Sequence, residues 1–155
     1  AIKEAAPDFH PSWDAVEKTY CYQMMRDASP DCRNYPFHWR IYKPVPVARL
    51  HIELQKLVGT FDFSAFCAGD AKVKNRVRTI SAITVSENLG EIKIEFRGNG
   101  FLKQMIRMIV GTAIEYLCHN AADKEFVNVL SHRSRLAAGR TAPAQGLTLT
   151  GIRYG

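Results

Sequence analysis

One arginine stands out among the residues that could take part in chemistry, because it lies in the most apolar stretch of the chain. Arg107 sits within the run MIRMIV, between Met105 and Val110. Burial of an unpaired guanidinium is strongly unfavourable. Arg107 must therefore reach solvent, pair with a core carboxylate such as Asp62, or line a site where it meets an anion. The sequence alone leaves the structural and the functional interpretations open.

Two tyrosines with a period of two form the second candidate feature. Tyr20 and Tyr22 lie in residues 18–25, whose alternation is typical of a β-strand, and they share one strand face with Met24. Such a face can stack nucleic-acid bases. Alternating tyrosines also fit ordinary β propensity, and from the residues alone this purely structural role is the favoured interpretation.

A run of cations forms the third feature. Lys72, Lys74, Arg76 and Arg78 fall at every second position. If this segment is extended, they form one positive edge about 20 Å long, which suits a phosphate backbone. A charged edge strand that resists aggregation is the alternative. Asn99, between two glycines, is expected to cap the helix that follows it or to let backbone N–H groups approach an anion.

The order of the expected strands and helices along the chain predicts an α+β fold. We expect an antiparallel (mixed) sheet with helices packed on one face. At 155 residues the chain is expected to be a single domain, residues 1–155. We expect strands at residues 18–25, 77–86, 91–97 and 146–154. We expect helices at residues 47–58, 101–118 and 123–132. The connections are a proline-rich loop at 26–46, a short turn or helix at 61–66 and a hairpin turn at 87–90.

Composition limits the classes of function. The net charge of +6 suits a polyanionic partner, although a merely basic soluble protein is the alternative. The four cysteines form no Cys-x-x-Cys pair, which favours a reduced, cytoplasmic protein. Neither they nor the histidines have metal-ligand spacing, so no metal is expected. No phosphate loop or dinucleotide fingerprint predicts a cofactor, and no apolar run predicts a membrane span.

Five segments, taken in order, resemble one family, tRNA pseudouridine synthase A. The most specific is residues 98–111, GNGFLKQMIRMIVG, which is similar to the family's NxFLxxMVRxIVG signature. The other segments are Phe9-His10 with residues 18–22 (KTYCY), residues 57–66 (LVGTFDFSAF), residues 78–80 (RTI) and residues 142–149 (APAQGLTL). Together they span nearly the whole chain.

This resemblance implies one half of the pseudouridine synthase fold and an isomerase that converts uridine to pseudouridine in the anticodon stem-loop of tRNA, without cofactor or metal. Tyr20 corresponds to the tyrosine that packs on the target base. Arg107 corresponds to the arginine that pairs with the catalytic aspartate, and Leu147 to a leucine that lines the uracil pocket. The basic residues 72–78 are candidates for contact with the RNA backbone. The family also implies a homodimer for the full-length protein.

The family's catalytic aspartate lies in an RTDxGVH motif, which these 155 residues do not contain. Gly139-Arg140-Thr141 follows the start of that motif, but Ala142 stands where the aspartate is required. In the family the motif lies upstream of the segment that Phe9-His10 resembles. The chain is therefore expected to be a C-terminal half that is inactive alone. A non-catalytic RNA-binding module and a protein-interaction domain with incidental charge are the alternatives.

Overall fold

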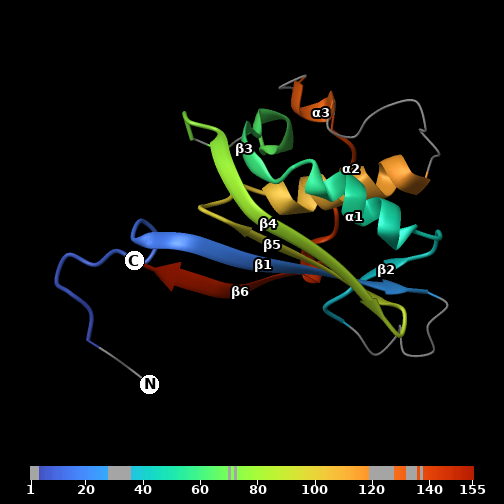
Figure 1. Cartoon of the computed structure of the whole chain (residues 1–155), viewed down its shortest axis with the longest axis horizontal. Helices are drawn as coiled ribbons and strands as arrows, with labels where there is room; N and C mark the ends of the chain where they lie inside the picture. The colour runs from blue at the N-terminus through green and yellow to red at the C-terminus, as the bar shows by residue number, and fades with distance from the viewer. Residues whose placement is uncertain are drawn as a thin grey trace.

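Six strands of the described residues form one mixed sheet in the computed structural model (Figure 1). The structure describes residues 4–27, 36–69, 71, 73–118, 128–131, 136 and 138–155. The strands are β1 (Ala15–Arg26), β2 (Trp39–Ile41), β3 (Gly59–Asp62), β4 (Val77–Asn88), β5 (Glu91–Gly98) and β6 (Leu147–Tyr154). The helices are α1 (Val47–Gln55), α2 (Met105–Cys118) and α3 (Asn128–Ser131), with 3-10 turns at Ser64–Phe66 and Ala144–Gly146.

Strand β1 has neighbours on both of its edges. One edge pairs antiparallel with β5, and β4 and β3 continue the sheet beyond β5. Two strands share the other edge. β6 pairs antiparallel with the first part of β1, from Ala15 to Tyr22, and β2 pairs in parallel with its last three residues, Met24 to Arg26. This arrangement makes the sheet mixed and leaves β6 at its margin.

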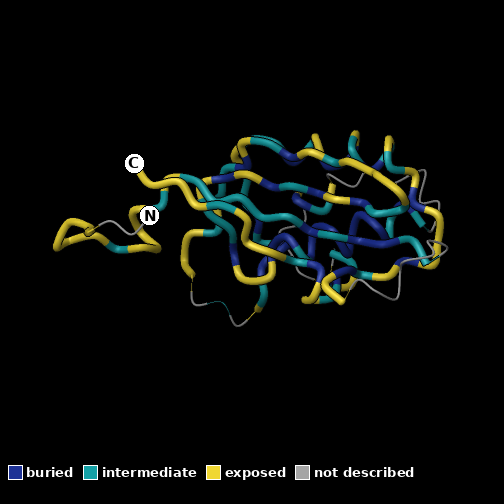
Figure 2. The backbone as a smooth tube through the Cα atoms, turned by 90° about the horizontal axis from the view of Figure 1, so that it is seen from below, coloured by how far each residue is buried: buried dark blue, intermediate teal, exposed yellow. Residues whose placement is uncertain are grey.

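The helices pack on one face of the sheet, because the strands alternate buried and exposed side chains (Figure 2). In β5, Ile92, Ile94 and Phe96 are fully buried in the core that α1 and α2 complete. Helix α2 is buried nearly all round, which explains its apolar composition. No helix within the described residues is long and apolar enough to cross a bilayer.

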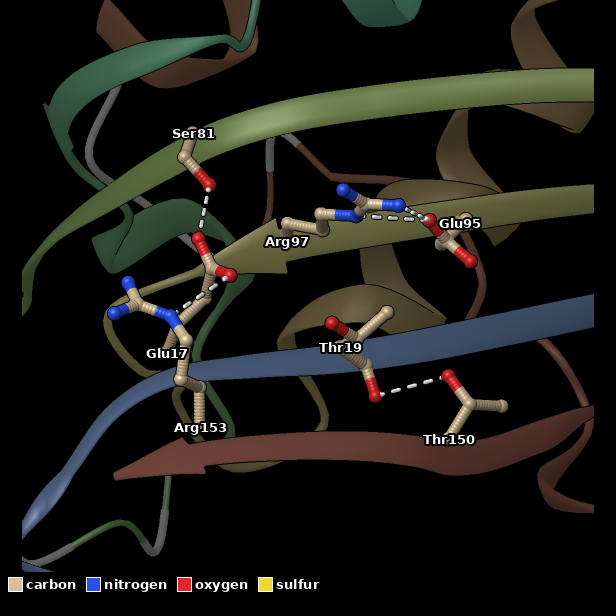
Figure 3. A network of polar contacts seen from close by, with 7 residues as sticks. All are labelled: Glu17, Thr19, Ser81, Glu95, Arg97, Thr150 and Arg153. Carbon is tan, nitrogen blue, oxygen red and sulfur yellow. Dashed lines mark hydrogen bonds and ion pairs between the residues drawn. The ribbon is translucent and has the colours of Figure 1, made fainter. Parts of the chain in front are cut away.

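The opposite face of the sheet carries a polar network (Figure 3). Glu17 on β1 accepts a hydrogen bond from Ser81 on β4 at 3.2 Å and lies 3.8 Å from the Arg153 guanidinium on β6. On β5, Arg97 pairs with Glu95 at 2.8 Å. The contacts of Glu17 link β1, β4 and β6, and the Arg97–Glu95 pair lies within β5, on a face that no described helix covers. They also account for the outward charges that the alternation in β5 predicts.

A more enclosed cluster surrounds Glu91 at the start of β5. One Glu91 oxygen lies 2.7 Å from His38 Nε2 and accepts a hydrogen bond from Gln23 at 3.3 Å. The other oxygen pairs with Lys93 at 3.0 Å. Burial acts to raise the pKa of the Glu91 carboxyl, but the hydrogen bonds from His38, Lys93 and Gln23 outweigh it. The pKa of Glu91 is therefore held below its ordinary value of 4.5.

Glu91→Gln is expected to lower the free energy of unfolding at pH 7 by about 1–2 kcal/mol, as for loss of a charge-assisted hydrogen bond. A carboxyl with a lowered folded-state pKa stabilises the fold above its unfolded-state pKa, and this contribution is lost as pH falls through the folded-state pKa. The two proteins should therefore converge in stability below about pH 4.5. Urea unfolding at several pH values measures the difference. Glu95→Gln, on the same strand face, is the control, and a difference that stays constant down to pH 3 would contradict the assignment.

The strand and helix predictions are confirmed in kind, with several differences. Residues 59–62 form β3, which pairs with β4, so only residues 64–66 of the turn or helix expected at 61–66 have that structure. Residues 39–41 form β2 inside the predicted loop 26–46, because β2 is defined by its pairing with β1. Helix α2 begins at Met105, since Gln104 has a φ of 63°, outside the helical region. In the predicted helix 123–132, residues 128–131 are helical and the others lie outside the described residues.

Candidate active site

The two alternating tyrosines of β1 have different environments. Tyr22 is fully buried in the core, so its ring is not available to a ligand. Tyr20 is half-buried, and its ring meets Phe101 edge-on, with centroids 5.4 Å apart and planes at 85°. Phe101 lies in the loop that leads into α2. Of the two tyrosines, Tyr20 alone retains a surface that can contact a base.

Tyr22 instead connects the parts of the site. Its hydroxyl donates a hydrogen bond of 2.7 Å to the carbonyl of Pro143. Its ring fills the space beside Gly146, where an added Cβ would lie 2.8 Å from the ring. Burial raises the pKa of the Tyr22 phenol, although the positive charge of Arg107 acts to lower it. Tyr22 therefore stays protonated as a donor and anchors the segment that leads into β6.

Arg107 lies in the first turn of α2 and is half-buried. Its Nε donates a hydrogen bond of 2.8 Å to the carbonyl of Ala142, and the Ala142 N–H donates one of 3.0 Å to the carbonyl of Arg107. Arg107 forms no ion pair with Asp62 or with any other described carboxylate. Asp62 accepts hydrogen bonds from the N–H and hydroxyl of Ser64. The alternative in which Arg107 pairs with Asp62 is therefore wrong.

The segment that ends at Ala142 lies directly against α2. An added Cβ at Gly111 would lie 2.0 Å from the Arg140 carbonyl oxygen and 2.7 Å from the Ala142 nitrogen. The Gly139 N–H donates a hydrogen bond of 2.9 Å to the hydroxyl of Thr112, the next residue of α2. The chain thus fixes the position of Ala142, and through it the guanidinium of Arg107. Nε is used by Ala142, and no described residue binds the two terminal nitrogens, which can therefore contact a ligand.

Leu147 begins β6 directly opposite Tyr22, and it is half-buried against the core. Tyr20 lies on the same sheet face, opposite Leu149. The structure therefore brings Leu147 and Arg107 to Tyr22 from two elements, with Tyr20 two residues along β1. Tyr20, Leu147 and Arg107 thus form one wall of the candidate site. It lies on the face of the sheet that carries the helices, at the margin formed by β1 and β6.

The basic run is less regular than its spacing predicts. Lys72 lies outside the described residues, and β4 begins only at Val77, so Lys74 and Arg76 precede the strand. Lys74 is exposed and Arg76 half-buried. The Arg78 guanidinium donates to two backbone carbonyls of its own turn. The described residues of the segment 72–78 therefore do not form a straight positive edge.

Asn99 does not cap α2. Its side-chain oxygen accepts a hydrogen bond of 3.0 Å from the Thr79 N–H, and its own N–H donates to the Thr79 carbonyl at 3.1 Å. The helix starts six residues later, at Met105. The capping prediction is wrong, because Asn99 closes the junction between β5 and β4 instead.

A cavity of about 390 Å³ lies further along α2 from Arg107. It is open to solvent on one side and is lined by residues from three parts of the chain: Trp39, Arg40, Ile41, Tyr42, Lys43, Gly111, Ile114, Glu115, Cys118 and Arg140. Neither the cysteine and histidine spacing nor the alternation of the strands predicts it. Its walls come together only through the pairing of β2 with β1 and the contact of residue 140 with α2.

Comparison with known proteins identifies the family of this chain. The sequence model described as tRNA pseudouridine synthase matches residues 54–155, which is more than half of the chain, so the chain belongs to that family. Curated relatives carry the name tRNA pseudouridine synthase A. The protein of Halalkalibacterium halodurans is 41% identical over 142 residues, which cover 90% of this chain and 53% of the relative.

Two further relatives with that name give the same result. The protein of Bacillus velezensis is 36% identical over 154 residues, covering 97% of this chain and 62% of the relative. The protein of Solibacter usitatus is 39% identical over 155 residues, covering 98% and 62%. The chain thus spans between about half and two thirds of the length of these relatives.

Proposed function

We propose that this chain forms part of a tRNA pseudouridine synthase that isomerises uridine to pseudouridine in the anticodon stem-loop of tRNA. The observation that carries the proposal is Arg107. Its guanidinium is fixed at Nε by Ala142, and it has no carboxylate partner among the described residues. An enzyme that pairs this arginine with a catalytic aspartate accounts for such a charge beside Tyr20 and Leu147.

The reaction breaks the bond between C1′ and N1 of uridine, turns the uracil, and joins C1′ to C5. The C5 proton is released and N1 gains a proton, so the product is an isomer and no cofactor is consumed. The target nucleotide has to leave the helical stack of the RNA to reach Tyr20, Leu147 and Arg107. Tyr20 would contact the uracil, and Leu147 would line its pocket.

We propose that the aspartate comes from a part of the protein outside these 155 residues, and that residues 1–155 form a single domain, the C-terminal half of the synthase. Arg107 would hold that carboxylate ionised and oriented, because a neighbouring guanidinium favours the charged form. tRNA is the proposed partner, with the cytoplasm as the site of action and a homodimer as the assembly of the full-length protein. The net charge of +6 supports a salt-dependent contact with RNA.

Release of the C5 proton gives a direct assay. tRNA labelled with tritium at uridine C5 is expected to lose label with the full-length protein and to keep it with the 155-residue chain alone. Robust turnover by the chain alone would refute the assignment of the aspartate. tRNA binding by a full-length protein that never turns over would favour the non-catalytic RNA-binding module.

A further inference from the structure

The cavity beside α2 continues from the Arg107 site along one face of the helix. Arg107, Gly111, Ile114 and Cys118 fall at i, i+4, i+7 and i+11, so they lie on one stripe, and the last three line the cavity. At a rise of about 1.5 Å per residue, the cavity spans about 6–16 Å along the axis from Arg107. It is therefore a neighbour of the proposed active site and not part of it.

The lining combines aromatic rings with positive charge. Tyr42 is 74% exposed, and the Arg40 guanidinium lies 5.7 Å from its ring centroid. The Trp39 ring packs edge-on against the ring of the buried Tyr22, with centroids 6.3 Å apart, and forms one side of the cavity. Aromatic faces of this kind stack bases with little dependence on sequence.

Three cations border these rings, and one carboxylate opposes them. Arg40 pairs with Asp27 outside the cavity. Arg140 and Lys43 complete the positive lining, while Glu115 accepts a hydrogen bond of 2.9 Å from the Arg140 backbone N–H. The lining therefore keeps a positive excess. The volume of about 390 Å³ lies in the range of small-molecule sites, which are mostly apolar with a few polar groups.

We propose that this cavity binds an unstacked nucleotide of the RNA, with its base against Tyr42 and its phosphate near Lys43 and Arg140. The inference rests on the proposed function, because it takes the substrate to be RNA. The cavity begins about 6 Å along α2 from Arg107, so the bound nucleotide lies close along the strand to the base that meets Tyr20. Binding at both places fixes the register of the strand.

Stacking is tested by Tyr42→Leu in the full-length protein, with binding of a labelled, unmodified tRNA transcript measured by fluorescence anisotropy. The dissociation constant is expected to rise about five- to a hundredfold, as for loss of one stacked base. Phe37→Leu is the matched control, because Phe37 is an aromatic residue, 69% exposed, close by in sequence and outside the cavity lining. Equal affinities for the two variants would overturn the stacking role.

Phosphate contact is tested by the double variant Lys43→Ala and Arg140→Ala, measured over a series of salt concentrations. The slope of log affinity against log salt is expected to fall by about 0.7 for each lost contact to a single strand. Arg97→Ala combined with Arg153→Ala, on the face of the sheet that no described helix covers, removes the same charge and is the control. An equal change in this control would overturn the proposal. Weaker binding by the cavity variants in a protein without turnover would leave the cavity proposal standing and refute the proposed function.

Discussion

Arg107→Lys in the full-length protein is expected to reduce uridine turnover about a thousandfold or more, the scale of losing a preorganised electrostatic contact in an active site. The affinity for tRNA should change little. Lysine keeps the positive charge, but it lacks the planar fork of arginine. Arg107 uses Nε to hold the Ala142 carbonyl and leaves its terminal nitrogens for a carboxylate. An ammonium group cannot make both contacts in that geometry.

Single-turnover release of tritium from C5-labelled tRNA measures the chemical step, and anisotropy measures binding. Arg97→Lys, in an exposed pair with Glu95, is the matched control and should leave both unchanged. Urea unfolding separates a catalytic effect from a structural one, because loss of the bond to Ala142 should cost only about 1 kcal/mol. Normal turnover in the Arg107 variant would refute its role. So would a loss of turnover that only follows the loss of folded protein.

The strands could be predicted from the sequence because their signal is local. Ile92, Ile94 and Phe96 alternate with charged residues, and this pattern requires one buried face whatever the neighbouring strands are. The turn at Leu89-Gly90 has positive φ at both residues, 50° and 83°, which suits the short hairpin predicted at 87–90. In such segments the local sequence determines the local structure.

Strand β2 could not be predicted from the sequence around it. Residues 39–41 lie between prolines and are too few to show a period, so they read as loop. They form a strand because the last three residues of β1 extend beyond the start of β6 and leave an unpaired edge. That unpaired edge depends on where β6 begins, more than a hundred residues away along the chain. The cavity depends on β2 and was unpredictable for the same reason.

The candidate site was predictable in its residues but not in its contacts. The apolar neighbours of Arg107 indicate a buried charge, yet they do not say what holds it. The structure shows that Ala142 holds the guanidinium. From the family resemblance, Ala142 was notable only as an alanine at a position where the motif requires aspartate. Ala142 is fully buried and bonded at both its N–H and its carbonyl to Arg107. The GRTA segment is therefore explained by packing against α2, with no reference to a catalytic motif.

Gly111→Ala provides the sharpest test of that packing, because two physical effects predict opposite signs. Alanine is the better helix former, so propensity alone predicts a gain of about 1 kcal/mol in the middle of α2. However, its Cβ would lie 2.0 Å from the Arg140 carbonyl oxygen and 2.7 Å from the Ala142 nitrogen. Both are backbone atoms of a segment bonded to Thr112, Glu115 and Arg107, so neither can rotate away as a side chain would. Overpacking should dominate and cost about 2–3 kcal/mol.

Urea unfolding of Gly111→Ala and of Gly69→Ala tests this expectation, since an added Cβ at Gly69 meets no heavy atom within 4 Å. The control should stay within about 0.5 kcal/mol of the parent. Turnover should fall together with stability in the Gly111 variant, because the clash displaces Ala142 and thereby the Arg107 guanidinium. A variant that is destabilised but fully active would mean that Arg107 is positioned independently of Ala142. A stabilised variant would mean that residues 140–142 do not lie against the helix.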